Sequence, residues 1–429
     1  MGWFRSVSRG LLVVAVLLAG CAGGARSPEA VTGAGAAGGR GPLTFVTAGD
    51  LTDYLAPLVA EWNAGRPAEP VSLVELPDSA DETRAQMLSE LRSGSSRFDV
   101  LNIDVAWTSE FAAAGLIAPL DRERFELAEF LPPVVETATF RGRLYAVPYV
   151  TNAGLLYYRK DLLDAAAERP PRTWAELARL ARTVAPRHGV GGYAGQFLPY
   201  EGLTVNVTEA IQSAGGAVLH EEGARVAVDS DAARAALSFL AGGVREGWIP
   251  AEALRFKEEE SKAAFEEGRL LFLRNWPYVY ADAARPGSKV AGRFEAAPLP
   301  GPYGPGTSVL GGSNLAVSAR SLHPATAADF LAYLTSERVQ RQVLTRGSLP
   351  PVRASLYTDP ELVTAHPYLP ILRESVLAAV PRPKSARYDQ VSLAVQAVAQ
   401  DVLALRCSPE EGVRRLTREL AAIPPLPAR

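Results

Sequence analysis

The feature of this sequence that most limits its possible folds is a pair of extended segments within residues 141–161, RGRLYAVPYVTNAGLLYYRKD. Residues 144–147 predict a short apolar strand, and we expect Pro148 to end its ladder because proline has no N–H to donate. Residues 155–158 predict a second strand, since aliphatic and aromatic side chains suit a packed sheet. The small and polar residues 151–154 separate the two strands. This pattern indicates a crossing between two lobes, although an ordinary hairpin or βα connection, taken alone, would show the same pattern.

The first third of the chain alternates expected strands with expected helices. Residues 43–47, 71–76 and 98–103 predict mostly apolar strands, and residues 51–63 and 83–91 predict the helices between them. This order predicts a parallel sheet with helices on both faces. Such sheets bind ligands at the carboxyl ends of their strands, so polar side chains that directly follow a strand are candidate ligand contacts.

The residue types found beside the expected strand ends are those that bind sugars. Carboxylate, amide and guanidinium groups can hydrogen-bond sugar hydroxyls, and aromatic rings can stack on the C–H face of a sugar ring. Each of these residues also has an ordinary structural explanation: Asp50 would cap a helix, Trp107 would lie in the core, and Glu110 would be a solvated acid in a first helical turn. The candidate ligand contacts are Asp50, Asp104, Trp107, Glu110, Asn152, Tyr200, Glu201, Trp276, Tyr278 and Arg387.

Later segments predict a second sheet and the helices around it. Residues 173–176, TWAE, form a capping-box pattern that opens a helix. Residues 191–196 and 270–273 predict strands, and residues 315–317 predict another. Residues 381–388, PRPKSARY, predict an exposed, rigid loop that carries basic and aromatic side chains.

The amino-terminal residues 1–20 predict a lipoprotein signal peptide. Arg5 and Arg9 give it a positive start, and an apolar run too short to span a bilayer as a mature helix follows them. The small residues before Cys21 match the lipobox of bacterial lipoproteins, in which the cysteine carries the lipid. The alternative is a plain signal peptide with a chance cysteine, but the chain has only 2 cysteines and one of them stands at this position.

The composition of the rest of the chain is that of a globular protein on a tether. Residues 21–41 are rich in glycine and alanine and predict a flexible tether. The chain is 48% hydrophobic and 21% charged, and its net charge of −3 becomes more negative once the two leader arginines are removed. Without a basic block or a basic–aromatic stripe, we expect no nucleic-acid partner. After lipidation Cys407 would be alone, so we expect no intramolecular disulfide.

The segments DVAWTSEF, VPYVTNAG, YEGLTVN, RNWPY and LGGSN, in this order, resemble those of family 1 extracellular solute-binding proteins, the maltose- and trehalose-type receptors of ABC importers. The resemblance extends from about residue 42 onward. It implies a two-lobe α/β fold of the periplasmic-binding-protein type, in which each lobe is a mostly parallel sheet flanked by helices and the ligand lies between the lobes. It also implies a first lobe of residues 42–150 and 309–336 and a second lobe of residues 151–308 and 337–429.

The functional expectations come from the same resemblance. It implies a monomeric, lipid-anchored receptor on the extracytoplasmic face of the membrane, which binds an α-linked disaccharide or short oligosaccharide and passes it to the transmembrane subunits of an ABC permease. It implies no catalysis, cofactor or metal. The contacts that it favours most are Asp104, Asn152, Glu201, Trp276 and Arg387, together with Gly312 as a point of close backbone approach.

Two other classes of function stay open at this point. Paired acids in a sugar-facing cleft could serve a glycosidase, although the chain has no HExxH, GxSxG or Walker motif and its 4 histidines are scattered. A receptor for another solute, such as a polyol or polyamine, is the third possibility. Arg387 and Trp276 favour a neutral sugar over a polyamine, because a polyamine pocket would be dominated by carboxylates without an arginine.

Overall fold

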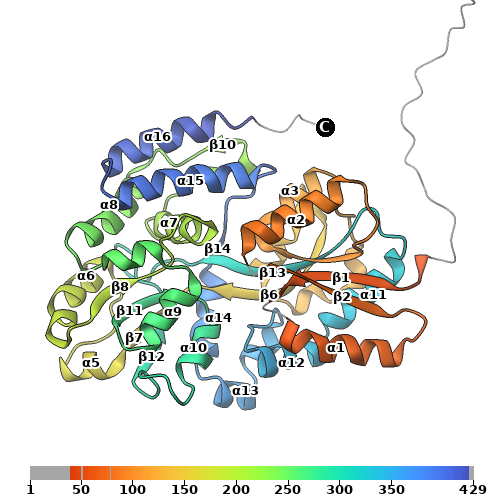
Figure 1. The fold of residues 1–429 in the computed structure, drawn as a ribbon, viewed down its shortest axis with the longest axis horizontal. Helices are drawn as coiled ribbons and strands as arrows, with labels where there is room; N and C mark the ends of the chain where they lie inside the picture. Colours follow the sequence, from red (N-terminus) through yellow and green to blue (C-terminus); the bar gives the residue numbers. More distant parts are fainter. Residues whose placement is uncertain (1–38, 50–51, 78, 425–429) are drawn as a thin grey trace, which may run out of the picture. The chain divides into compact units, whose positions relative to one another are not determined.

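The structure of the chain is a computed structural model that describes residues 39–49, 52–77 and 79–424. The expected signal peptide, the lipidation site Cys21 and all but the end of the tether lie outside the described residues, and so does Asp50. From residue 39 onward the chain forms one compact unit with two separate hydrophobic cores, each built on its own sheet (Figure 1). The expected two-lobe α/β fold is therefore confirmed. None of the described helices is long and apolar enough to cross a membrane.

The first sheet begins with the expected alternation of strands and helices. Its strand order is β14-β13-β3-β1-β2, with β6 paired to β13. Strand β1 pairs in parallel with both β2 and β3, as the sequence predicts. These elements are β1 (Leu43–Ala48), α1 (Thr52–Gly65), β2 (Val71–Leu76), α2 (Ala80–Arg92) and β3 (Val100–Asp104).

Strand β13 (Val309–Val317) joins the parallel part of this sheet to β6 (Ala146–Ala153) and runs antiparallel to both β3 and β6. The expectation that Pro148 ends its strand is wrong, because Pro148 lies inside β6, opposite Asn314. The register of the pair shifts between Ser313 and Asn314, and an irregularity of this kind accommodates a residue that has no N–H to donate.

The second sheet has the strand order β12-β7-β11-β8. It is less parallel than expected: only the β8–β11 pair is parallel, while β7 runs antiparallel to β11 and to β12. The reason is that β7 enters directly from the first sheet, so its direction is set by β6 and not by a helical crossover. Its strands are β7 (Leu155–Arg159), β8 (Gly191–Ala194), β11 (Leu270–Asn275) and β12 (Phe294–Ala297).

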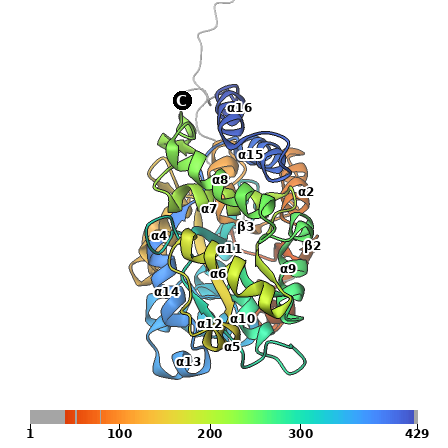
Figure 2. The ribbon, with the colours of Figure 1, turned by 90° about the vertical axis from the view of Figure 1, so that its left-hand side faces the viewer.

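Helices cover both sheets, and the remaining strands are short. In the second lobe, α7 packs against α8 and α15, which in turn pack against α16 (Figure 2). Besides α1 and α2, the helices around the first core are α3 (Thr108–Ala113), α4 (Pro132–Thr137), α11 (Pro324–Leu334), α12 (Glu337–Gly347), α13 (Pro360–Ala365) and α14 (Leu369–Ala378). Those of the second lobe are α5 (Lys160–Ala165), α6 (Trp174–Thr183), α7 (Glu201–Ser213), α8 (Asp231–Arg245), α9 (Glu258–Glu266), α10 (Tyr278–Ala283), α15 (Tyr388–Leu403) and α16 (Pro409–Ala421). The two-residue strands are β4 (Thr139–Phe140), β5 (Arg143–Leu144), β9 (Leu219–His220), β10 (Arg225–Val226) and β14 (Val380–Pro381).

The chain passes between the two sheets at three places. The first crossing is Gly154, between β6 and β7, where the sequence predicts a break between two strands. The second is Ser308, which leads from the second lobe into β13, and the third is the segment between β14 and α15. Strands β6, β13 and β14 lie side by side next to these crossings (Figure 1).

The division of the chain between the lobes differs from the expected one after residue 336. The buried apolar side chains between Val339 and Ala379 belong to the first core, whereas the expected division places residues 337–429 in the second lobe. The second core takes up the chain again at Val391, within α15. Helices α12, α13 and α14 therefore complete the first lobe before the third crossing returns the chain to the second.

Candidate ligand-binding site

The guanidinium of Arg382, on the third crossing, joins carboxylates from the two lobes. Its Nη1 donates to Glu201 Oε1 at 2.6 Å, and its Nη2 donates to Asp104 Oδ1. Asp104 is the last residue of β3 in the first lobe, and Glu201 is the first residue of α7 in the second lobe. One arginine on a crossing segment thus connects two side chains that the sequence proposes as ligand contacts.

The expectation that residues 381–388 form an exposed loop is wrong. Arg382 is 5% exposed and Tyr388 is 1% exposed, because both side chains turn inward to Glu201. Prolines on either side of Arg382 hold the backbone extended while its guanidinium lies between the lobes.

Both carboxylate oxygens of Glu201 are held by groups of the protein itself. Its Oε1 accepts hydrogen bonds from Arg382 and from the Tyr388 hydroxyl, and its Oε2 accepts one from Ser392 Oγ at 2.6 Å. Burial raises the pKa of the Glu201 carboxyl, and the positive charge of Arg382 opposes this change. Asp104 is more accessible: its side chain is 23% exposed, and its Oδ1 also accepts the N–H of Ala106 at 2.8 Å. Glu201 therefore orients Arg382, while Asp104 can still face a ligand.

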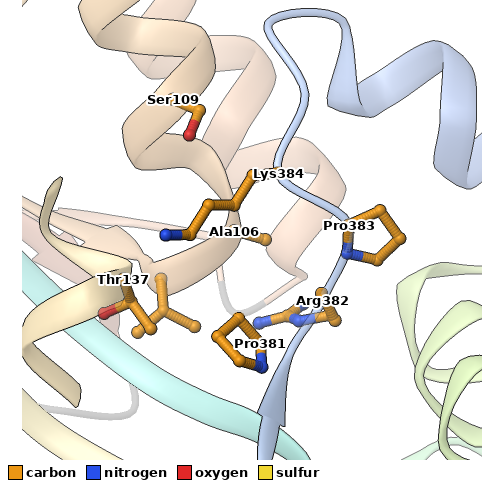
Figure 3. A pocket seen from close by; sticks show the side chains of 8 residues that line it. Ala106, Ser109, Thr137, Pro381, Arg382, Pro383 and Lys384 are labelled. Atoms are coloured by element: carbon orange, nitrogen blue, oxygen red, sulfur yellow. The ribbon is translucent and has the colours of Figure 1, made fainter. Parts of the chain in front are cut away.

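A small pocket lies beside Arg382, between the start of α3 and the third crossing (Figure 3). Lys384 extends across it, between Ser109 and Thr137 (Figure 3). The Nε of Arg382 is buried and has no hydrogen-bond partner among the described residues. The lining residues are Val105, Ala106, Ser109, Thr137, Pro381, Arg382, Pro383 and Lys384.

Trp276 meets the first lobe at the second crossing. It directly follows β11, and its half-buried ring lies so close to Gly311 that a Cβ on this glycine would be 3.0 Å from the ring. Asn152 lies opposite Gly311 in the β6–β13 pair. The structure therefore brings Asn152 and Trp276 together from opposite lobes, as a cleft site requires.

Gly312 has a strictly structural reason to be glycine. Its φ is +106°, and a Cβ at this position would lie 2.1 Å from the carbonyl oxygen of Val150. The close backbone approach is thus between β13 and β6.

The hydroxyls of Tyr200 and Tyr278 are both held within the second lobe. Tyr200 donates to Glu258, and Tyr278 donates to Glu259 Oε1 at 2.7 Å, so both tyrosines bond to the first turn of α9. Burial is the largest cause that raises the pKa of each of these hydroxyls. Their rings are half-buried, which leaves part of each ring accessible.

Within the described part of the chain, the side chains of three expected contacts form no hydrogen bond with the residues of the Arg382 cluster, which are Arg382, Glu201, Asp104, Tyr388 and Ser392. Trp107 is 4% exposed and stacks on Phe111 within the first core. Glu110 is 3% exposed and forms a two-point ion pair with Arg84, and burial raises its pKa. Arg387 donates its Nε to the carbonyl of Pro424 at 3.1 Å. Asp50 lies outside the described residues.

The residues that hold the candidate contacts in place through hydrogen bonds and stacking were not identified from the sequence. These are Arg382, Tyr388, Ser392, Arg274 and Glu209. For Arg382 there was one usable signal, because it directly follows a strand end, which is the rule that selected Asp104. Strand β14 is only two residues long, however, so it leaves no recognisable pattern. The other residues meet only through tertiary packing.

Comparison with known proteins gives one family. Residues 48–341 match the family described as Bacterial extracellular solute-binding protein. A probable ABC transporter-binding protein of Deinococcus radiodurans is 34% identical over 363 residues, which are 82% of this chain and 86% of that protein. A mannitol-binding protein of Pseudomonas aeruginosa is 26% identical over 311 residues, 68% of this chain and 69% of that protein. The structure of maltose-bound MalE3 from T. maritima matches with a TM-score of 0.82 and 33% identity, over 89% of this chain and 99% of that one.

Proposed function

The chain belongs to the bacterial extracellular solute-binding proteins, and on this premise we propose that it is the sugar receptor of an ABC importer. Its ligand in this proposal is an α-linked disaccharide or short oligosaccharide of the maltose or trehalose type. Support for the solute class comes from the likeness to a protein solved with maltose, and support for the transporter class comes from the Deinococcus relative. We further propose that Cys21 is lipidated and holds the receptor at the extracytoplasmic face of the membrane, where it meets the permease.

The observation that carries the proposal is that side chains of the types that bind sugars come from both lobes to the crossings. Asp104 and Asn152 come from the first lobe, and Trp276 comes from the second. A sugar stacked on Trp276 could reach the two polar groups only while the lobes are close together. Binding would therefore shift an equilibrium between open and closed forms toward the closed form.

The glycosidase alternative is disfavoured by the hydrogen bonds of Glu201. A general acid or base needs an oxygen that can face the substrate, but both oxygens of Glu201 already accept bonds from Arg382, Tyr388 and Ser392. The polyamine alternative is disfavoured by charge. Asp104 and Glu201 are balanced beside the pocket by Arg382 and Lys384, so the region offers a polycation no excess of negative charge.

A polyol receptor is the second candidate. The relative in Pseudomonas aeruginosa that is described as mannitol-binding favours it, because it matches over about two thirds of both chains. A polyol and a sugar ring present similar hydroxyls, but a linear polyol lacks the flat C–H face that stacks on an aromatic ring.

Titration calorimetry of the chain from residue 22 onward, with product analysis of each mixture, tests these alternatives. The ligands are maltose, trehalose, maltotriose, sucrose, mannitol and spermidine. Tight binding of one disaccharide that is recovered intact would support the sugar receptor. Binding of mannitol alone would replace it with a polyol receptor, and release of glucose would establish a glycosidase.

A further inference from the structure

A buried ion pair lies behind Trp276 and takes no direct part in the proposed site. Glu209 on α7 accepts hydrogen bonds from Arg274 on β11, with Nε to Oε2 at 2.6 Å and Nη2 to Oε1 at 2.9 Å. The side chain of Arg274 is 1% exposed and that of Glu209 is 5% exposed. A two-point pair of this kind fixes the plane of the guanidinium as well as its position.

The guanidinium of Arg274 in turn covers one face of Trp276. Its central carbon lies 4.1 Å from the centroid of the ring, within the range of a cation–π contact. The Nη1 of Arg274 also donates to Gln196 at 3.1 Å, so the guanidinium is held on three of its nitrogens. One face of Trp276 is thus occupied by the protein, and the orientation of the ring depends on the arginine plane.

The same carboxylate also holds two of the crossings between the lobes. Oε1 of Glu209 accepts from Ser308 Oγ at 2.7 Å and from Val309 N at 3.1 Å, at the second crossing. Ser308 Oγ accepts from Gly154 N at 2.6 Å, at the first crossing. Two residues beyond Val309, Gly311 packs against the ring of Trp276. Glu209 therefore lies between the aromatic side chain and the backbone about which the lobes would move.

We infer that Glu209 is a positioning residue of the binding site, which orients Trp276 through Arg274 and ties this orientation to the crossings through Ser308. This inference rests on the proposed function, since it assigns a role in ligand stacking to Trp276. The consequence is that the ring faces a ligand correctly only while the crossings keep the geometry seen in this structure. Stacking on Trp276 and closure of the lobes are then coupled.

Arg274→Lys is the main test, because lysine keeps the charge that Glu209 needs and loses the flat surface that covers Trp276. We expect the Kd for maltose, or for whichever tested sugar binds, to rise about tenfold. The matched control is Arg159→Lys on the neighbouring strand β7, where Arg159 makes a two-point pair with Asp161 at 2.8 and 2.6 Å. This control should leave the Kd within about twofold, because the substitution weakens only the pair between Arg159 and Asp161.

A double-mutant cycle separates positioning from general destabilisation. In a Trp276→Ala background, Arg274→Lys should cause no further rise in Kd, because the group that it positions is gone. A full additional tenfold rise in that background would overturn the inference. Ser308→Ala tests the link between Glu209 and the crossings. It should raise the Kd roughly three- to fivefold, because it removes the hydroxyl between Gly154 and Glu209.

A measurement without ligand keeps this test apart from that of the proposed function. Subtracting the fluorescence spectrum of Trp276→Phe from that of the parent gives the emission of Trp276 alone. We expect this emission to shift to longer wavelength and to be quenched more by acrylamide in Arg274→Lys and in Ser308→Ala. An unchanged Trp276 emission in both variants would refute the positioning role. Failure of the unaltered chain to bind any tested sugar or polyol would instead refute the proposed function.

Discussion

Arg382 and Glu201 form a buried ion pair in which Nη1 lies 2.6 Å from Oε1, and the same guanidinium reaches Asp104 in the other lobe. This contact distinguishes Arg382 from Arg387, the arginine that the sequence favours, whose Nε bonds to a backbone carbonyl near the carboxyl end. The two arginines are five positions apart in one crossing segment, so they form a natural pair of variants.

We expect Arg382→Met to lower the free energy of unfolding by about 3 kcal/mol, because it leaves the buried carboxylate of Glu201 without its cation. It should also abolish measurable sugar binding. Arg387→Met should change neither quantity, since its hydrogen bond is exposed. Urea unfolding and calorimetry of both variants measure the two effects. Loss of binding in Arg387→Met with binding retained in Arg382→Met would reverse this assignment.

The two tryptophans that follow strands should respond in opposite ways to truncation. Trp276 is half-buried, so Trp276→Ala should cost about 2 kcal/mol of binding free energy, roughly thirtyfold in Kd, with little change in Tm. Trp107 lies in the first core, so Trp107→Ala should cost about 3–5 kcal/mol of stability. Thermal unfolding and calorimetry of the two variants check this contrast, and an unaltered Kd in Trp276→Ala would remove that ring from the site.

The sequence could predict the elements whose local signals agree with their packing. Strands β1 and β2 are apolar runs with helix α1 between them, and Thr173 and Glu176 form the expected capping box. The crossing at Gly154 was also predictable, because a small residue separates two strongly apolar strands.

Other parts of the fold depend on contacts that no local pattern records. The start of β13, Val309–Ser313, is rich in small residues and gives no strand signal, yet pairing with β6, with β14 and, at Ser313, with β3 holds it extended. Residues 339–379 belong to the first core because the chain returns to the second lobe only at the third crossing. The strand before that crossing, β14, is only two residues long and leaves no pattern in the sequence. In the same way, only tertiary packing decides that Arg382 turns inward and that Arg387 does not.

The ion pair of Glu110 predicts a pH effect on stability. Burial raises the pKa of Glu110 above its ordinary value of 4.5, and Arg84 only partly offsets this. The folded chain then binds the proton more tightly than the unfolded chain does. This contribution to stability is greatest below the unfolded pKa and is lost as the pH rises through the folded pKa.

Comparison with Glu110→Gln isolates this contribution. The difference in unfolding free energy, parent minus variant, should fall as the pH rises above about 4.5 and then level off. Urea unfolding across this range measures it, and a difference that rises with pH would mean that Arg84 outweighs burial.

Lipidation of Cys21 is tested by changing each cysteine in turn. Cys21→Ala should move the protein from the membrane fraction to the soluble fraction, since Cys21 is the cysteine of the expected lipobox. Cys407→Ala should remain in the membrane fraction, because Cys407 is a half-buried thiol next to the second core. Retention of Cys21→Ala in the membrane fraction would contradict the lipoprotein assignment.

Two adjacent glycines of β13 should separate strand geometry from ligand binding. Gly312→Ala forces a side chain onto a residue with φ +106° and places its Cβ 2.1 Å from Val150 O, so we expect a loss of about 2–4 kcal/mol of stability. Gly311→Ala meets the far edge of the Trp276 ring at 3.0 Å instead, and the ring can shift to relieve this contact. Gly311→Ala should therefore keep most of its stability and raise the sugar Kd, because the shifted Trp276 ring no longer stacks on the guanidinium of Arg274. Thermal unfolding with calorimetry distinguishes the two, and an unchanged Kd in a folded Gly311→Ala variant would show that the position of the ring does not limit binding.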